Sequence, residues 1–414
     1  MRMFVCQCLQ IEAPVRRASS KRVIATVLTV CSLSLLAGLL LKLCPVSEAR
    51  RVSLLCYSDL KTFFEYRGIR QMPFPYVQGG MQGNHLLPGS IEYPVLTGIF
   101  AWVTAQGAWS PRSYLAISAL FLGALGLLVS YLLARMAGWR ALLWAAAPAL
   151  VLYAFHNWDL LAVAPAVAGL WCWWQGRPAW AAVWFGVGTA AKLFPAIFVG
   201  PLTLEAWFLG NKRAAASRLV VGAGTALLIN LPFMLVNPSG WYATYAFHKL
   251  RPPNIDSIWG LKLSWSFAAT SWSVEQLNLL TTFLILSSFL VIFVLGWRRA
   301  SRDGTYPVIQ VCGALLAAFL LWNKVHSPQY LLWLLPFFVL LRMSLLWWAA
   351  YAILDGLVYL TVFYLGRISL DLASPYLQGA VYGRAALLLA LIIVLLRSDG
   401  RVVRSDRREA AFRT

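Results

Sequence analysis

The chain has 414 residues, of which 60% are hydrophobic and only 12% are charged. Soluble domains have about a quarter of their residues charged, so this composition excludes an ordinary soluble protein and predicts a polytopic membrane protein. The formal net charge of +20 does not indicate nucleic-acid binding, because most basic residues stand in short turns between apolar runs, as in cytoplasmic loops. We therefore expect the lipid bilayer, and no nucleic acid, as a partner.

The first apolar run, residues 23–44, follows a basic cluster and has about the length that crosses a bilayer. A cleaved signal peptide is the rival interpretation, but the run is long and its end is a poor cleavage site. We predict a retained anchor preceded by a basic cytoplasmic N-terminus, residues 1–22. Cys44 and Cys56 flank the start of the next loop and either form a disulfide, if that side is oxidising, or remain thiols.

A long first outer loop, residues 45–112, precedes the remaining apolar runs, which bring the total to about twelve spans. These runs cover residues 114–133, 141–155, 160–174, 179–193, 196–209, 219–236, 277–297, 308–322, 330–341, 344–365 and 381–396. They predict one all-α membrane domain over residues 23–396, with a second large outer loop at 237–276. The basic turns then share one side, which places both termini, including the basic tail 397–414, in the cytoplasm beneath a plasma (inner) membrane.

The runs between residues 141 and 209 are shorter than a free-standing span. An alternative topology counts residues 95–108 as a span and merges 179–209 into one helix. We favour the first topology because the alternative places Arg135 and Arg140 outside, and because short helices are tolerated where they line a protein-walled cavity. Residues 95–108 then form a juxtamembrane helix lying along the interface.

The preferred topology brings the unusual polar residues to the outer face. Asp59 follows the first span and suits a general base toward a hydroxyl group, although a solvated loop acid or a helix N-cap is an equal alternative. Glu92 and Tyr93 open the juxtamembrane helix; they either support a site or mark the membrane boundary.

Cations also occur where apolar runs end. Lys192 lies deep in an apolar stretch, where a phosphate partner or snorkelling to the interface would satisfy its charge. Asn323, Lys324 and His326 stand between two apolar runs, where they suit the neutralisation of a leaving phosphate.

The turn His156-Asn157-Trp158-Asp159 either supports this site or serves only to hold two short helices together. Further candidates for supporting or substrate-binding roles are His248, Arg251 and Gln329. No ligand spacing of a recognised metal site appears, and we predict no metal ligands.

Five segments, in this order, resemble a known family: YSDLKTFFEYR, IEYPVLTG, NWDLLAVAP, GTAAKLFP and NKVHSPQYLLWLLP. They resemble the C-type superfamily of integral-membrane glycosyltransferases (GT-C), and more narrowly glycosyltransferase family 87. The family often has two prolines after the tyrosine, whereas Val95 stands at the second position here, which leaves the start of the helix open.

The resemblance implies a GT-C fold and a hexosyltransferase. The donor it implies is a polyprenyl-phosphate sugar, with mannose as the default, and the acceptor is a glycolipid or a cell-envelope glycan. Transfer would occur on the extracytoplasmic face with inversion of the anomeric configuration, as is common in the superfamily, with Asp59 as the catalytic base and no cofactor. A transporter or flippase of lipid-linked sugars is the alternative, and a non-catalytic scaffold is a third.

Overall fold

The computed structural model describes residues 20–44, 55–260, 272–365 and 370–398, and these residues are mainly helical. Six helical stretches among them are long and apolar enough to cross a bilayer. They are built on α1 (Lys21–Lys42), α4 (Pro111–Ala137, continued by η2 Gly138–Ala141 and α5 Leu142–Ala145), α10 (Lys212–Val236), α12 (Val274–Asp303), α15 (Leu345–Leu360, continued by η5 Thr361–Leu365) and α17 (Leu370–Arg397). The fold is that of a helical membrane protein, while the predicted count of about twelve spans is not confirmed.

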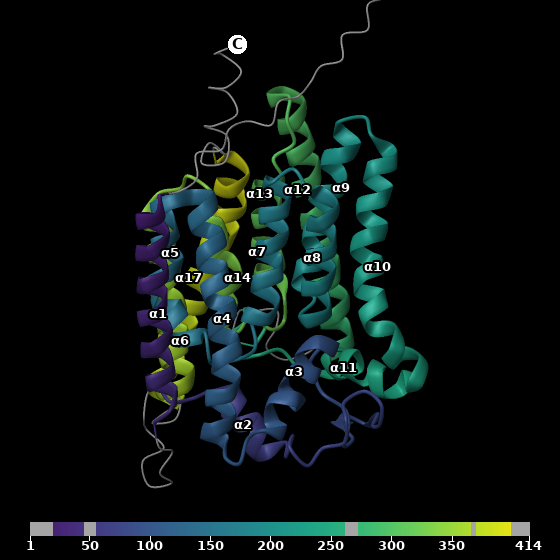
Figure 1. Ribbon diagram of the computed structural model, residues 1–414, viewed down its shortest axis with the longest axis vertical. Coiled ribbons are helices and arrows are strands. Elements are labelled where there is room, and N and C mark those ends of the chain that lie inside the picture. The colour runs from purple at the N-terminus through teal and green to yellow at the C-terminus, as the bar shows by residue number, and fades with distance from the viewer. Residues whose placement is uncertain (1–19, 45–54, 261–271, 366–369, 399–414) are drawn as a thin grey trace, which may run out of the picture.

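Shorter apolar helices pack among these longer ones (Figure 1). They are α6 (Pro148–Tyr153), α7 (Leu160–Trp174), α8 (Pro178–Ala191), η3 (Phe194–Phe198), α9 (Val199–Phe208), α13 (Val308–Trp322), η4 (Pro328–Tyr330) and α14 (Leu331–Leu340). Every residue of α14 is buried. A helix of this length cannot cross a bilayer alone, but neighbouring helices shield its ends from lipid.

A layer of short helices and loops covers the lower end of the bundle in Figure 1. It contains α2 (Asp59–Tyr66), α3 (Val95–Gln106), α11 (Pro238–Leu250) and a small hairpin of β1 (Met81–Gln82) and β2 (His85–Leu86), in which Met81 pairs with Leu86. The predicted helix after Tyr93-Pro94 is therefore present as α3, and it starts at Val95. The chain is also interrupted at Lys192, so residues 179–209 are not one merged helix.

The opposite end of the bundle carries several of the basic turns, and the α9–α10 and α12–α13 connections lie there in Figure 1. Arg140 donates to the carbonyls of Phe338 (2.7 Å) and Leu341 (2.8 Å) at the end of α14. Arg299 donates to the carbonyl of Leu396 near the end of α17. These contacts satisfy carbonyls that a helix end leaves without an intrahelical partner.

Cys44 and Cys56 form a disulfide, which selects the first of the two predicted alternatives. It ties the end of α1 to the segment before α2. The predicted N-terminus lies largely outside the described residues, as do parts of both outer loops (45–54 and 261–271) and the tail beyond residue 398.

Tyr76, in the loop that precedes α3, fixes the start of this helix. Its side chain is fully buried, and its hydroxyl donates to the carbonyls of Tyr93 (2.7 Å) and Pro94 (3.1 Å). A Cβ added at Gly98 would lie 1.8 Å from this hydroxyl oxygen. Glycine at this position therefore permits the close approach on which both hydrogen bonds depend.

We predict that Gly98→Ala lowers the free energy of unfolding by about 1–3 kcal/mol, because the new methyl group displaces Tyr76. Thermal unfolding of the purified protein in detergent measures the effect. Gly224→Ala in α10 is the matched control, since a Cβ there meets no atom within 4 Å. Equal melting temperatures for the two variants would contradict the prediction.

Candidate active site

The first turn of α2 is fastened to the turn between α6 and α7. The Ser58 hydroxyl donates to the carbonyl of Phe155 (2.7 Å), and the backbone N–H of Asp59 donates to the carbonyl of His156 (2.7 Å). Ser58 is the N-cap of α2, so Asp59 is its first residue and does not have the capping role offered as an alternative. The two segments, almost one hundred residues apart in the chain, thus place Asp59 beside Asn157.

The carboxylate of Asp59 is held from two sides. The Tyr57 hydroxyl donates to Oδ1 (2.7 Å), and Nδ2 of Asn157 donates to Oδ2 (2.7 Å). Nδ2 of Asn157 also donates to the Tyr93 hydroxyl (2.8 Å). The carboxylate remains 26% exposed, so it is oriented by its neighbours yet open to a ligand.

Lys192 ends α8 in an extended conformation, and its ammonium group turns back into the protein. It donates to Oδ1 of Asp159 (2.6 Å) and to Oδ1 of Asn157 (3.1 Å). Burial raises the pKa of Asp159, and the ammonium of Lys192 opposes that rise. The charge of Lys192 is therefore offset by a protein carboxylate, and snorkelling is not what satisfies it.

Aromatic rings surround the same ammonium group. The Nζ atom lies 5.8 Å from the ring centroid of Tyr93, 5.7 Å from that of Tyr330 and 5.6 Å from that of Trp333. Trp333 also donates to Oδ1 of Asp159 (2.7 Å). Ring faces attract cations, so this cage holds Lys192 in place at the wall of a cavity.

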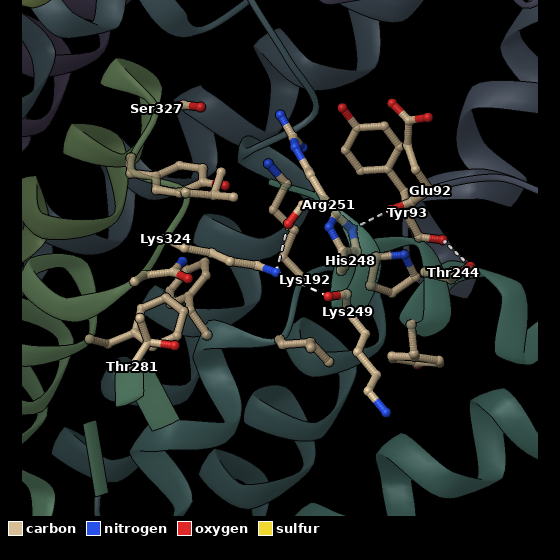
Figure 2. Close-up of a pocket in the computed structure, with 18 of the residues that line it drawn as sticks. Glu92, Tyr93, Lys192, Thr244, His248, Lys249, Arg251, Thr281, Lys324 and Ser327 are labelled. Atoms are coloured by element: carbon tan, nitrogen blue, oxygen red, sulfur yellow. Dashed lines mark hydrogen bonds between the residues drawn. The ribbon is translucent and has the colours of Figure 1, made fainter. Parts of the chain in front are cut away.

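A cavity of about 1150 Å³ opens beside these groups (Figure 2). Ten residues predicted for the site line it: Asp59, Glu92, Tyr93, Asn157, Lys192, His248, Arg251, Asn323, Lys324 and Gln329. Apolar side chains of α12 line it too, and three of them, Leu279, Phe283 and Leu286, are more than 60% exposed on the surface of the bundle. The cavity therefore joins a polar centre to an apolar flank.

One wall of the cavity is cationic. The Lys324 ammonium donates to Oδ1 of Asn278 (2.6 Å) and to the carbonyls of Arg251 (2.8 Å) and Lys249 (3.2 Å). Figure 2 shows the two contacts with the Arg251 and Lys249 carbonyls. All three acceptors are neutral, so they leave its charge uncompensated. We call Arg251 and Lys324 the cationic wall. Burial and the neighbouring Arg251 lower the pKa of Lys324 to about 8.

The cavity is also lined by Arg67 and Tyr57, which the sequence interpretation did not select. Arg67 forms an ion pair with Glu92, and Nε2 of His248 contacts the carbonyl of Glu92 (2.7 Å). The place of Tyr57 two residues before Asp59 was the only available signal. Tyr245 in the second outer loop also lines the cavity, while Trp265 of the same loop lies outside the described residues.

Three predicted residues stand behind the cavity wall: His156, Asp159 and His326. Nε2 of His326 lies 3.2 Å from the Tyr351 hydroxyl, and burial together with Arg384 lowers its pKa well below the ordinary value. Burial lowers the pKa of His156 to about 4. Both shifts favour the uncharged form of the ring. In this arrangement the His326 ring does not reach the cavity, so the predicted contact with a phosphate is absent.

Among the residues that the structure describes, no three His, Cys, Asp or Glu side chains are grouped so as to hold a metal ion.

The sequence matches the profile of glycosyltransferase family 87 over residues 92–323, which is more than half of the chain. The chain belongs to glycosyltransferase family 87. It is accordingly a membrane glycosyltransferase of the GT-C type. The matched region contains Asn157, Lys192 and most of the cavity, whereas Lys324 lies one residue beyond its end and Asp59 lies 33 residues before its start. A search of curated proteins found no match.

We predict that Asp159→Asn destabilises this family 87 protein by about 3–5 kcal/mol, because it leaves the buried charge of Lys192 unpaired. The double variant Asp159→Asn with Lys192→Met removes both charges and is expected to recover most of the loss. Thermal unfolding of the wild type, both single variants and the double variant gives the coupling energy. Additive effects would show that the pair does not carry the predicted interaction.

Proposed function

We propose that this glycosyltransferase moves a sugar, with mannose as the first candidate, from a polyprenyl-phosphate donor to a glycolipid or cell-envelope glycan. The observation that carries the proposal is the joining of three features in one cavity: a carboxylate held by two donors, an uncompensated cationic wall and an apolar flank on α12. A lipid-linked donor needs all three, since its tail, phosphate and sugar must be bound together.

Asp59 is proposed as the general base. The acceptor hydroxyl oxygen attacks the anomeric carbon of the donor sugar while its proton passes to the Asp59 carboxylate. The bond from the anomeric carbon to the phosphate oxygen breaks, and the bonding electron pair leaves with the polyprenyl monophosphate. A single displacement of this kind inverts the anomeric configuration.

The cationic wall suits the leaving phosphate. The donor is a phosphodiester with one negative charge, and the departing monoester carries close to two. Positive groups held on neutral acceptors interact more strongly as this charge develops, which favours the transition state over the bound donor. Lys192 already has Asp159 as its counterion, so in this proposal it orients Asn157 and the sugar site and adds less to phosphate binding.

Helices α2 and α11, which contribute residues to the cavity lining, lie at the end of the bundle opposite the α9–α10 and α12–α13 connections (Figure 1). Basic turns favour the cytoplasmic side, which supports an extracytoplasmic site in a plasma (inner) membrane, with both termini cytoplasmic. No cofactor is part of the proposed reaction.

We predict that Asp59→Asn lowers the turnover number by about 10² to 10⁴ with donor affinity retained, because only the proton acceptor is lost. The measurement is transfer of labelled sugar from purified polyprenyl-phosphate donors in proteoliposomes, with products identified by mass spectrometry. Glu65→Gln is the matched control, since Glu65 is an exposed acid on the same helix that does not line the cavity. Undiminished turnover in Asp59→Asn removes Asp59 from the mechanism, and donor movement across the bilayer without a glycosidic product favours a flippase.

The Michaelis constant for the donor should rise as the pH exceeds about 8, where Lys324 loses its proton. Lys324→Arg should move this rise to higher pH, because a guanidinium stays charged, while the Michaelis constant for the acceptor stays constant in both enzymes. Donor and acceptor titrations across the alkaline range measure both constants. Identical donor profiles for wild type and Lys324→Arg would exclude Lys324 as the titrating group.

A further inference from the structure

Arg384 is a buried charge in the last apolar helix. It lies on α17, within a stretch long enough to cross a bilayer, and only 1% of its surface is exposed. It does not line the cavity. An ionised side chain at such a position is costly, and it is kept in membrane proteins where it has a specific partner and a function.

The guanidinium joins three segments that are far apart in the chain. Nη1 donates to Oδ1 of Asp355 on α15 (2.7 Å). Nη2 donates to the carbonyl of Asp256 (2.5 Å) and to the carbonyl of His326 (2.8 Å). Because Asp355 already supplies a counterion, Arg384 has no need of an anionic ligand, and its second nitrogen is used to bind backbone.

Both carbonyls belong to the loops that form the cationic wall. The loop around Asp256 begins at Arg251, whose guanidinium donates to Oδ1 of Asn254 (2.8 Å). The backbone N–H of Asn254 donates to the carbonyl of Lys324 (3.0 Å), two residues before His326. Arg384 is therefore connected to Arg251 and to Lys324 through hydrogen bonds and short stretches of backbone.

We infer that Arg384 is a positioning residue, which holds the two loops of the cationic wall in the register that receives the leaving phosphate of the donor. This inference rests on the proposed function, because it assigns the wall to a lipid phosphate. The planar guanidinium fork binds two carbonyls and a carboxylate at once, which a lysine cannot do in the same geometry. Misplacing a binding group by about 1 Å can cost about 10²-fold in rate.

The test uses the double variant Asp355→Asn with Arg384→Met, which removes the buried pair without leaving one charge behind, and the single variant Arg384→Lys. The matched control is Arg140→Met, because Arg140 also binds loop and helix-end carbonyls but at the opposite end of the bundle. In proteoliposomes we expect the Michaelis constant for the donor to rise by about tenfold or more in both Arg384 variants. The constant for the acceptor should stay within about twofold, whereas a purely structural defect lowers only the amount of active enzyme and leaves both constants unchanged.

A second measurement does not depend on activity. The acylation rate of the Lys324 amine by an amine-reactive reagent is followed by peptide mass spectrometry in the protein without donor. Release of Lys324 from its three acceptors should raise this rate several-fold in the Arg384 variants and not in Arg140→Met.

An unchanged Lys324 acylation rate and an unchanged donor constant in the double variant overturn the positioning role. A raised acylation rate in the Arg384 variants, with a wild-type protein that neither transfers sugar nor binds polyprenyl monophosphate, supports the positioning of the loops and overturns the proposed function instead.

Discussion

The buried ion pair between Lys192 and Asp159 is the constraint on which the geometry of the cavity in this glycosyltransferase depends. It forms only because α8 stops at Lys192 and α7 starts after Asp159, so that two helix ends meet in the interior. Asn157 extends the pair to Asp59 by accepting from Lys192 and donating to the carboxylate. If the helix continued through residue 192, the Lys192 ammonium group would no longer contact Asp159 and Asn157. The orientation of the proposed base, Asp59, would then be lost as well.

The structure separates two uses of positive charge in an apolar environment. Lys192 and Arg384 each have a buried carboxylate partner, Asp159 and Asp355, and so contribute to the architecture. Lys324 is held by an amide and two carbonyls, which orient its charge without neutralising it. Dipoles fixed in advance cost little reorganisation when charge develops on a ligand. Lys192, which is paired with a carboxylate, and Lys324, which is not, both line the same cavity.

The short helices explain how such a polar centre is tolerated in a membrane protein. α14 and most of α13 are buried, whereas α10 and α12 expose long apolar faces. Broken and irregular backbone is permitted at membrane depth when protein covers it. The outer helices thus provide the contact with lipid, and the inner ones are free to end where the site needs their termini.

Composition and hydropathy alone determined the membrane class, the apolar runs and the polar residues Asp59, Asn157, Lys192 and Lys324 near the ends of those runs, because these features are local in the chain. The partner of Lys192 and the inward turn of His326 were decided only by tertiary packing. Arg384 was not singled out, since a lone arginine in an apolar run shows no pattern, and its partners lie 29 to 128 residues away. Hydropathy reports where a segment is buried, but the pairing of buried charges depends on which segments pack together.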